Sequence, residues 1–310
     1  MKIDRILAGL LIAACFFSGL AVFLSPRSAP SFSFGGEMKG PADIALFEIS
    51  GIISDGELGE PFPSSGSNTG AGQLMSRIQQ AEKDGVKAIL LKVNSPGGTA
   101  AASQAVFEEL MRVRKEGKVK IVASCGDVAA SGAYYISAAA DRILANPAST
   151  VGSIGVILHT TDVSGLMGKL GVRAAVIKSG TYKDILSPYR AMTPSEKSIL
   201  QVLVDETYGQ FVEGVARGRR QPLATVKAVA DGRIFTGTAA LKAGLIDDLG
   251  SYPDAVRFTA KLVGLKGEPN IRNYTSVSFW EKVMPRLESC LPFLPQGGLN
   301  WNKIPLSLME

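Results

Sequence analysis

The sequence feature that most constrains the fold is an alternation of buried-strand and helix patterns between residues 88 and 145. The expected strands are residues 88–93, 119–124 and 142–145, and the expected helices between them are 100–115 and 131–140. A helix between two strands carries the chain back across one face of a sheet, so that the strands pair in parallel. The sequence therefore predicts an α/β fold with a parallel sheet.

The chain outside this region adds elements of the same kind. Residues 44–49 form an expected first strand, and residues 72–84 carry apolar side chains at helical spacing. Thr193 and Glu196 form a capping box, which predicts a long helix that runs to about Arg217. These elements extend the expected α/β core on both sides.

The composition excludes several classes of function. The chain has 310 residues, of which 46% are hydrophobic and 20% charged, as in ordinary globular proteins. Its Lys and Arg residues are scattered among Asp and Glu for a net charge of +5, so we expect no nucleic-acid partner. A single histidine, His159, excludes His-clustered zinc sites, and the three cysteines cannot form a disulfide framework. We expect neither a metal nor a cofactor.

The N-terminal segment carries no charge from Ile6 to Leu24. A helix over this run is roughly 28 Å long at about 1.5 Å per residue, which matches the hydrocarbon thickness of a bilayer. A cleaved signal peptide is one alternative, although its apolar stretch is usually only about 7–15 residues. Lipidation at Cys15 is another, but the apolar run continues well past that residue. We therefore expect residues 1–24 to remain as a membrane anchor.

The charges beside this segment indicate its orientation. Lys2 and Arg5 precede the apolar run and Arg27 follows it, which is a slight bias toward a cytoplasmic N-terminus. The rest of the chain would then lie outside the cytoplasm. Residues 25–41 are rich in Ser, Pro and Gly and form an expected linker.

A candidate nucleophile lies where a strand leads into a helix. Ser131 follows a turn of small residues, which exposes its hydroxyl and directs helix N–H groups toward the same point. Residues 94–98 (Asn-Ser-Pro-Gly-Gly) form an expected sharp turn at the C-terminal end of the preceding strand, at the same edge of a parallel sheet. Adjacent glycines there can present free N–H groups to a substrate carbonyl. The alternatives are a plain helix cap at Ser131 and a helix-entry turn at residues 95–98.

Six segments of the chain together resemble the signal peptide peptidase A family (SppA), the serine–lysine peptidases of bacterial membranes, in its short single-repeat form. They are residues 94–99, 126–140, 151–157, 179–190, 232–237 and 243–247. The resemblance spans residues 42–265 and implies a ClpP/crotonase-like fold of repeated ββα units. Residues 266–310 are left as a C-terminal tail.

The resemblance also implies roles for individual residues. Ser131 matches the family nucleophile, Lys183 the general base, and Ser153 the serine that orients the lysine amine. Gly98 and Gly132 match the backbone donors of the oxyanion hole. In the short form, neighbouring subunits contribute the serine and the lysine, which implies a homo-oligomeric ring, with an octamer suspected.

This chemistry needs no histidine. A lysine acts as a base only in its neutral form, which burial among apolar groups favours. Lys183 would take the Ser131 proton as the hydroxyl attacks a peptide carbonyl, and would then activate the water that releases the acyl group. The substrates implied by the resemblance are signal-peptide remnants in the bacterial cytoplasmic membrane, with the catalytic domain on the extracytoplasmic side.

Three other functions remain open from the residues. A ClpP-like Ser–His peptidase would use His159, but this histidine comes too late in the chain for the ClpP pattern. A crotonase-like acyl-CoA enzyme would have the oxyanion hole without a nucleophilic serine, and a membrane anchor would be unusual for it. A membrane scaffold with a decayed site would lack some of the serine, lysine and glycine residues, all of which are present here.

Overall fold

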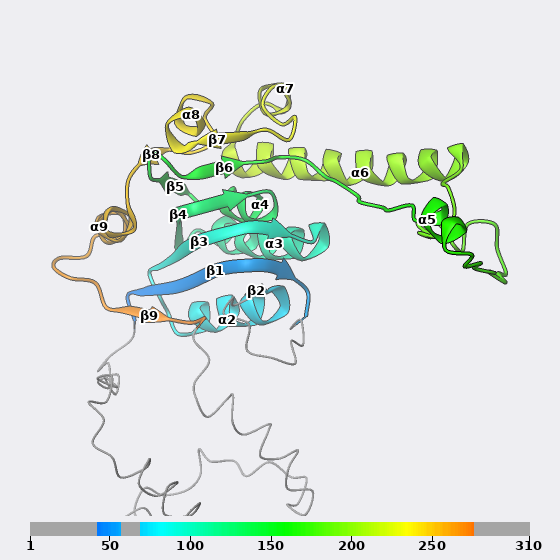
Figure 1. Cartoon of the computed structure of the whole chain (residues 1–310). Helices are drawn as coiled ribbons and strands as arrows, with labels where there is room; N and C mark the ends of the chain where they lie inside the picture. The colour runs from blue at the N-terminus through cyan, green and yellow to red at the C-terminus, as the bar shows by residue number, and fades with distance from the viewer. Residues whose placement is uncertain (1–41, 57–68, 276–310) are drawn as a thin grey trace, which may run out of the picture. The chain divides into compact units, whose positions relative to one another are not determined.

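A mostly parallel β-sheet forms the centre of the described chain (Figure 1). The computed structural model describes residues 42–56 and 69–275, which belong to one compact unit. The main strand order is β2-β1-β3-β4-β5-β8, and every neighbouring pair in it is parallel. The strands are β1 (Ile44–Ser54), β2 (Thr69–Gly70), β3 (Ala88–Gly98), β4 (Lys120–Ala130), β5 (Arg142–Ala145) and β8 (Asp248–Leu249). The predicted α/β fold with a parallel sheet is therefore confirmed.

Short strands pair with the ends of the long ones. β9 (Ile271–Asn273) pairs with the first residues of β1, and β6 (Thr150–Gly152) pairs with the last residues of β4. β7 (Ile234–Thr236) runs antiparallel to β6. β5 pairs with the first half of β4, and β6 pairs with the end of β4 along the same edge. Strand pairing on this edge therefore continues to Ala130, the residue before Ser131.

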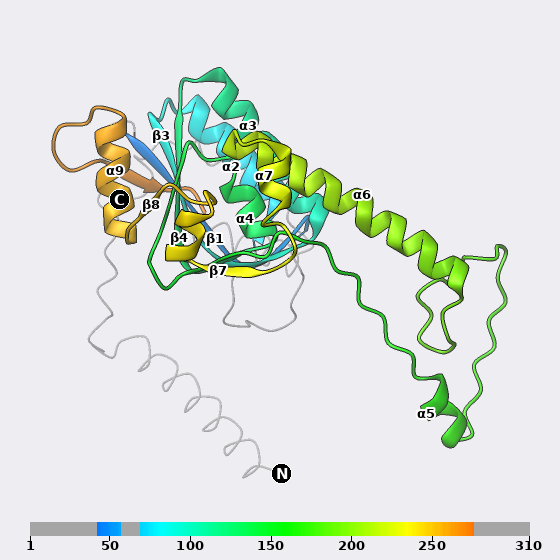
Figure 2. The same ribbon diagram turned by 90° about the horizontal axis from the view of Figure 1, so that it is seen from above.

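Helices cover the two faces of the sheet unequally (Figure 2). The larger core is formed with α2 (Ala71–Lys83), α3 (Ala100–Glu116), α4 (Gly132–Ser137), the C-terminal part of α6 (Pro194–Arg219), α7 (Leu223–Lys227) and α8 (Gly237–Lys242). The smaller core lies under α9 (Tyr252–Leu262). Side chains of β1 alternate between the two cores, with Phe47 and Ile49 in the larger and Ile44 and Leu46 in the smaller.

A long arm, residues 157–203, projects from this body. It includes α5 (Ser164–Lys169) and the first turns of α6, and both views show that it extends away from the sheet (Figures 1 and 2). Within the arm, only Glu196 is buried. Its exposed large apolar residues are Ile157, Leu166, Leu170, Val172, Val176, Ile177, Tyr182, Leu186, Tyr189, Ile199, Val202 and Leu203. The arm therefore exposes more large apolar side chains than is usual for a surface loop in contact with water.

The structure extends two of the predicted strands. Residues 94–98, predicted as a sharp turn, continue β3, with a register shift against β4 between Val93 and Ser95. β4 likewise continues to Ala130, and α4 covers only Gly132–Ser137 of the helix predicted over 131–140. Both extensions end at the point where the candidate site lies.

Other predictions concern the ends of the chain. The predicted anchor (1–24) and linker (25–41) lie outside the described residues, as does the tail from residue 276 onward. Residues 271–273, which the sequence assigns to the tail, form β9 beside β1, so the folded part reaches beyond residue 265. In the part of the chain that the structure describes, no helix is long and apolar enough to span a bilayer.

Candidate active site

Ser131 occupies the turn between β4 and α4 in a strained backbone conformation. Its φ is 53° and its ψ is −123°, a combination that residues other than glycine rarely adopt. The Ser131 amide donates to the Gly152 carbonyl at 2.8 Å, and the Ser131 carbonyl accepts from the Tyr135 amide at 2.9 Å. The side chain makes no capping hydrogen bond to α4. The backbone thus fixes the residue, and its hydroxyl is not used as a helix cap.

Glycines bring the backbone close to Ser131. A Cβ placed on Gly97, whose φ is +105°, would lie 2.8 Å from the Gly132 amide nitrogen and 2.9 Å from the Ser131 Cβ. A Cβ placed on Gly132 would lie 3.3 Å from the Gly98 amide nitrogen and would overlap the Ser103 hydroxyl. The amides of Gly98 and Gly132 therefore lie near each other beside Ser131, as an oxyanion hole requires.

Ser153 directly follows Gly152, whose carbonyl accepts the Ser131 amide. Ser153 has a φ of 52° and donates its amide to the Arg233 carbonyl at 2.9 Å. Two successive positive φ values, at Gly152 and Ser153, turn the chain sharply after β6. The structure thus places Ser153 close to Ser131 in the fold.

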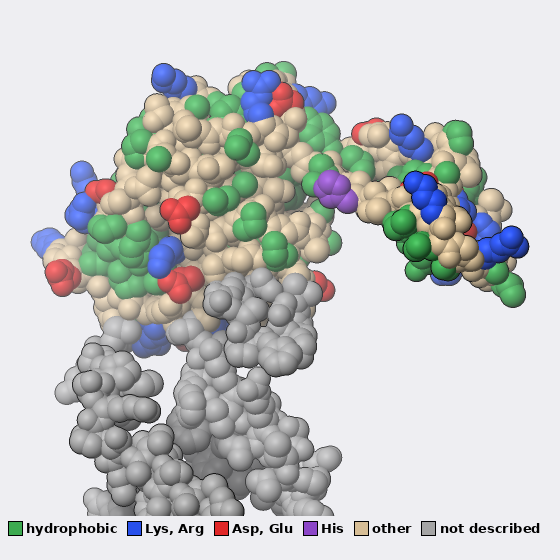
Figure 3. All heavy atoms as spheres, in the orientation of Figure 1, with side chains coloured by type: hydrophobic (Ala, Val, Ile, Leu, Met, Phe, Trp, Pro, Cys, Tyr) green, Lys and Arg blue, Asp and Glu red, His purple; other side chains and the backbone are tan. Residues whose placement is uncertain are grey.

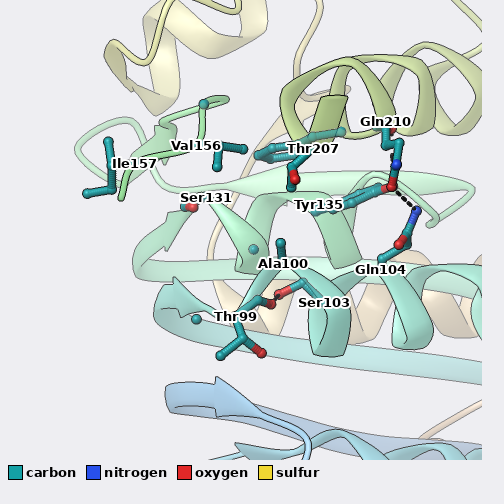
Figure 4. A pocket seen from close by; sticks show the side chains of 14 residues that line it. Thr99, Ala100, Ser103, Gln104, Ser131, Tyr135, Val156, Ile157, Thr207 and Gln210 are labelled. Carbon is teal, nitrogen blue, oxygen red and sulfur yellow. Dashed lines mark hydrogen bonds between the residues drawn. The ribbon is translucent and has the colours of Figure 1, made fainter. Parts of the chain in front are cut away.

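A cavity of about 220 Å³ adjoins Ser131 (Figure 4). It is lined by Gly98, Thr99, Ala100, Ser103, Gln104, Ser131, Gly132, Tyr135, Gly155, Val156, Ile157, Thr207, Gln210 and Phe211. These residues come from the junction of β3 and α3, the turn at Ser131, α3, α4, α6 and the chain after β6. The cavity is smaller than the roughly 300–1,000 Å³ typical of cofactor and small-molecule sites, and its size suits part of a peptide chain.

The cavity has mixed chemistry along its length. Figure 4 shows Ser131 toward one end and the side chains of Gln104 and Gln210 toward the other, where they share a hydrogen bond of 3.2 Å. Tyr135 lies between them and packs against Phe211, with ring centroids 4.6 Å apart. Burial raises the pKa of Tyr135, so its hydroxyl stays protonated and donates to the Gln210 carbonyl at 3.3 Å.

Lys183 does not line this cavity. It is exposed, in the turn between α5 and α6, and this turn belongs to the projecting arm. Within one chain, the structure therefore brings together Ser131, Gly98 and Gly132, with Ser153 close by, and leaves Lys183 apart.

His159 is also exposed and is absent from the cavity wall. Figure 3 shows the histidine, in purple, on the surface where the arm leaves the body. A histidine base for Ser131 within one chain has no support in this geometry, because a base must come within hydrogen-bond reach of the hydroxyl.

The Cys125 thiol is not a competing nucleophile. Burial raises the pKa of the Cys125 thiol to about 12, so it is not a nucleophile near neutral pH. Within residues 42–56 and 69–275, no three His, Cys, Asp or Glu side chains are grouped closely enough to hold a metal ion.

The sequence predicted Ser131 and the glycines as site residues but missed most of the residues that line the cavity. Thr207, Gln210 and Phe211 lie on α6, far along the chain from Ser131, and only tertiary packing brings them there. The long helix was predicted, but nothing in its pattern distinguishes a side chain that faces a cavity from one that faces the core.

A nucleophile-like serine at a strained strand-to-helix turn, with two glycine amides beside it and a side-chain cavity, defines a serine hydrolase site on an α/β fold. Residues 113–266 match the model of the family described as peptidase family S49. This range includes Ser131, Ser153 and Lys183. The chain belongs to this family and is a serine peptidase.

Named relatives agree with this assignment. A protease-named protein of Synechocystis sp., slr0021, is 42% identical over 72% of this chain and 75% of its own length. A protein of Enterococcus faecium named as a signal peptide peptidase, SppA, is 36% identical over 76% of this chain and 66% of its own length. Protease 4 of Salmonella typhi is 36% identical over 74% of this chain, which spans only 37% of that longer relative.

Proposed function

We propose that this protein is a membrane-anchored endopeptidase that cleaves peptide bonds with a Ser131–Lys183 dyad. The observation that carries the proposal is the strained, uncapped Ser131, with the Gly98 and Gly132 amides close beside it. Lys183 is assigned as the base from the family resemblance. Among the described residues, neither a histidine nor a carboxylate lines the cavity, so no side chain of its wall competes for this role.

The mechanism follows from these groups. Neutral Lys183 takes the proton of the Ser131 hydroxyl as its oxygen bonds to the substrate carbonyl carbon. The Gly98 and Gly132 amides donate to the oxygen that becomes negative. The peptide C–N bond breaks as the lysine passes its proton to the leaving amine. Lys183 then takes a proton from the water that attacks the acyl-enzyme, and it returns that proton to the Ser131 oxygen as the ester C–O bond breaks and the peptide carboxyl product leaves.

Lys183 has to come from a neighbouring copy in this proposal. Within one chain it lies on the arm, outside the cavity, and the arm carries many exposed apolar side chains. Burial of these side chains against a second copy would stabilise an assembly at about 25 cal/mol per Å² of apolar surface. A head-to-tail interface whose rotation closes forms a ring, which is the homo-oligomer implied by the resemblance. Ser153 would orient the lysine amine there.

The substrate and location follow from the sequence and the relatives. The uncharged run over residues 6–24 supports an N-terminal transmembrane anchor, with the catalytic part on the extracytoplasmic side of a bacterial cytoplasmic membrane. The name of the Enterococcus faecium relative supports residual signal peptides as substrates. The ClpP/crotonase-like ring architecture is part of the same proposal, and no cofactor enters the reaction.

The test is covalent labelling of the detergent-extracted full chain with a fluorophosphonate, followed by peptide mapping. Label on Ser131 that disappears in Ser131→Ala, together with peptide hydrolysis, supports the proposal. Ser76→Ala is the matched control, because Ser76 is exposed on α2. Label on another serine, or near-normal hydrolysis by Ser131→Ala, would overturn it.

A further inference from the structure

The arm contains one ordered group of charged side chains beside Lys183. The Asp184 carboxylate accepts from Lys178 Nζ at 2.6 Å and from Arg190 Nε and Nη2 at 2.9 Å each. Arg190 Nη1 donates to Glu196 at 2.8 Å. One guanidinium therefore bridges two carboxylates, of which Asp184 directly follows the proposed base.

Glu196 joins this group to the start of α6. Its carboxylate also accepts from the Thr193 amide at 2.8 Å and from the Thr193 hydroxyl at 2.9 Å, which completes the capping box. α6 then runs without interruption from Pro194 to Arg219, and its later residue Phe211 lines the cavity beside Ser131. The ion group thus connects the Lys183 turn to a helix that is packed into the body.

Burial and charge set this group apart from the rest of the arm. The side chains of Glu196 and Asp184 are only 3% and 11% exposed, although their surroundings are solvated. The two cations balance the two carboxylates, and hydrogen bonds from Arg190 lower the pKa of Glu196 to about 2 and that of Asp184 still further. The two carboxylates therefore stay ionised and paired with the Arg190 guanidinium at any pH where Lys183 could act as a base.

We propose that Arg190 is a positioning residue, which fixes the Lys183 turn to α6 by bridging Asp184 and Glu196. This inference rests on the proposed Ser–Lys mechanism. The other hydrogen bonds of this turn stay within the arm: the Lys183 amide donates to the Gly180 carbonyl at 3.1 Å, the Ile185 amide to the Tyr182 carbonyl at 3.1 Å, and Lys178 Nζ to the Thr181 carbonyl at 2.8 Å. Without the bridge, the turn would pivot, and the amine would no longer meet the neighbouring Ser131 at a defined point.

The test uses the full-length protein with Arg190→Ala and Arg190→Lys. A lysine keeps the charge but lacks the planar fork that spans two carboxylates. Both variants should lose about 10²-fold in kcat, the typical effect of a displacement of about 1 Å, with KM within about twofold. Methylguanidinium should restore part of the kcat of Arg190→Ala, and methylammonium should not.

Arg112→Ala is the matched control. Arg112 also bridges several carboxylates, those of Glu82, Glu109 and Glu116, but it joins α2 to α3 away from the cavity. The kcat of the Arg112→Ala variant should stay at the wild-type value.

Three results would overturn the inference. The first is a normal kcat in Arg190→Ala, and the second is a kcat loss that methylguanidinium leaves unchanged. The third is a loss that follows disassembly in size-exclusion chromatography, which would make Arg190 an assembly residue. If instead Lys183→Ala retains activity, the proposed dyad fails, so the two failures are distinguishable.

Discussion

The contact between α3 and α4 yields a stability prediction that bears on the active site. In Gly132→Ala, the new methyl group would overlap the Ser103 hydroxyl and lie 3.1 Å from the Ser103 Cβ. Both residues are buried, so either the Ser103 hydroxyl must leave its hydrogen bond to the Thr99 carbonyl or the two helices must move apart. Overpacking of this kind costs about 1–3 kcal/mol. The free energy of unfolding should fall by that amount in a denaturant titration, and fluorophosphonate labelling of Ser131 should slow because the Gly132 amide moves.

A double-mutant cycle identifies the cause. Ser103→Gly removes both atoms that the new methyl group would meet, at a cost of about 1 kcal/mol for glycine in a helix. The double variant should then be more stable than the sum of the two single changes predicts, with a coupling of about 0.5–3 kcal/mol. Gly209→Ala is the control, because no atom lies within 4 Å of a Cβ at that helical position. Strict additivity in the cycle would refute the reasoning.

The remaining predictions concern other residues. Lys183→Arg should be as inactive as Lys183→Ala, because arginine stays protonated, whereas His159→Ala should keep turnover within a few fold; peptide hydrolysis assays compare the three. In the native protein, Cys125 should resist iodoacetamide at pH 8 and react once unfolded, since burial raises its pKa to about 12, and peptide mass spectrometry checks this. Arg219→Ala should lower the free energy of unfolding by about 1–3 kcal/mol, because the Asp247 carboxylate loses its 2.8 Å partner but keeps the Ile143 amide at 2.8 Å and Arg142 at 3.7 Å. Chemical denaturation measures the loss.

The sequence predicted the sheet well where a strand is a continuous apolar run. Residues 142–145 match β5 in full, because Ile143, Leu144 and Ala145 form a buried apolar run after the exposed Arg142. Residues 94–98 were misjudged because Asn, Pro and Gly are typical of turns. In the fold, the Ser95 side chain bonds to the backbone where the register of β3 against β1 shifts. Its hydroxyl donates to the Gly51 carbonyl at 2.6 Å and accepts the Gly97 amide at 3.0 Å. A side-chain bond of this kind leaves no trace in hydrophobic periodicity.

Only the part of the candidate site that lies in one local stretch of the chain was predictable from the sequence. Ser131 and the glycines lie at a local junction of strand, turn and helix, which the sequence contains in one stretch. The α6 wall of the cavity, with Gln210 and Phe211, depends on how a distant helix packs. The separation of Lys183 from the cavity depends on the course of the arm, and no local pattern encodes it. Local residues therefore identify the groups, whereas tertiary structure determines which of them meet.

The central claim is that Ser131 of one copy works with Lys183 of its neighbour, and a mixing experiment tests it most directly. Ser131→Ala and Lys183→Ala chains, each inactive alone, are coexpressed and extracted together, and peptide hydrolysis is measured. Random mixing in a ring places an intact serine beside an intact lysine at about a quarter of the sites, so about a quarter of the wild-type activity should return. If the mixed assembly stays as inactive as its parents, the two residues do not form a site between copies.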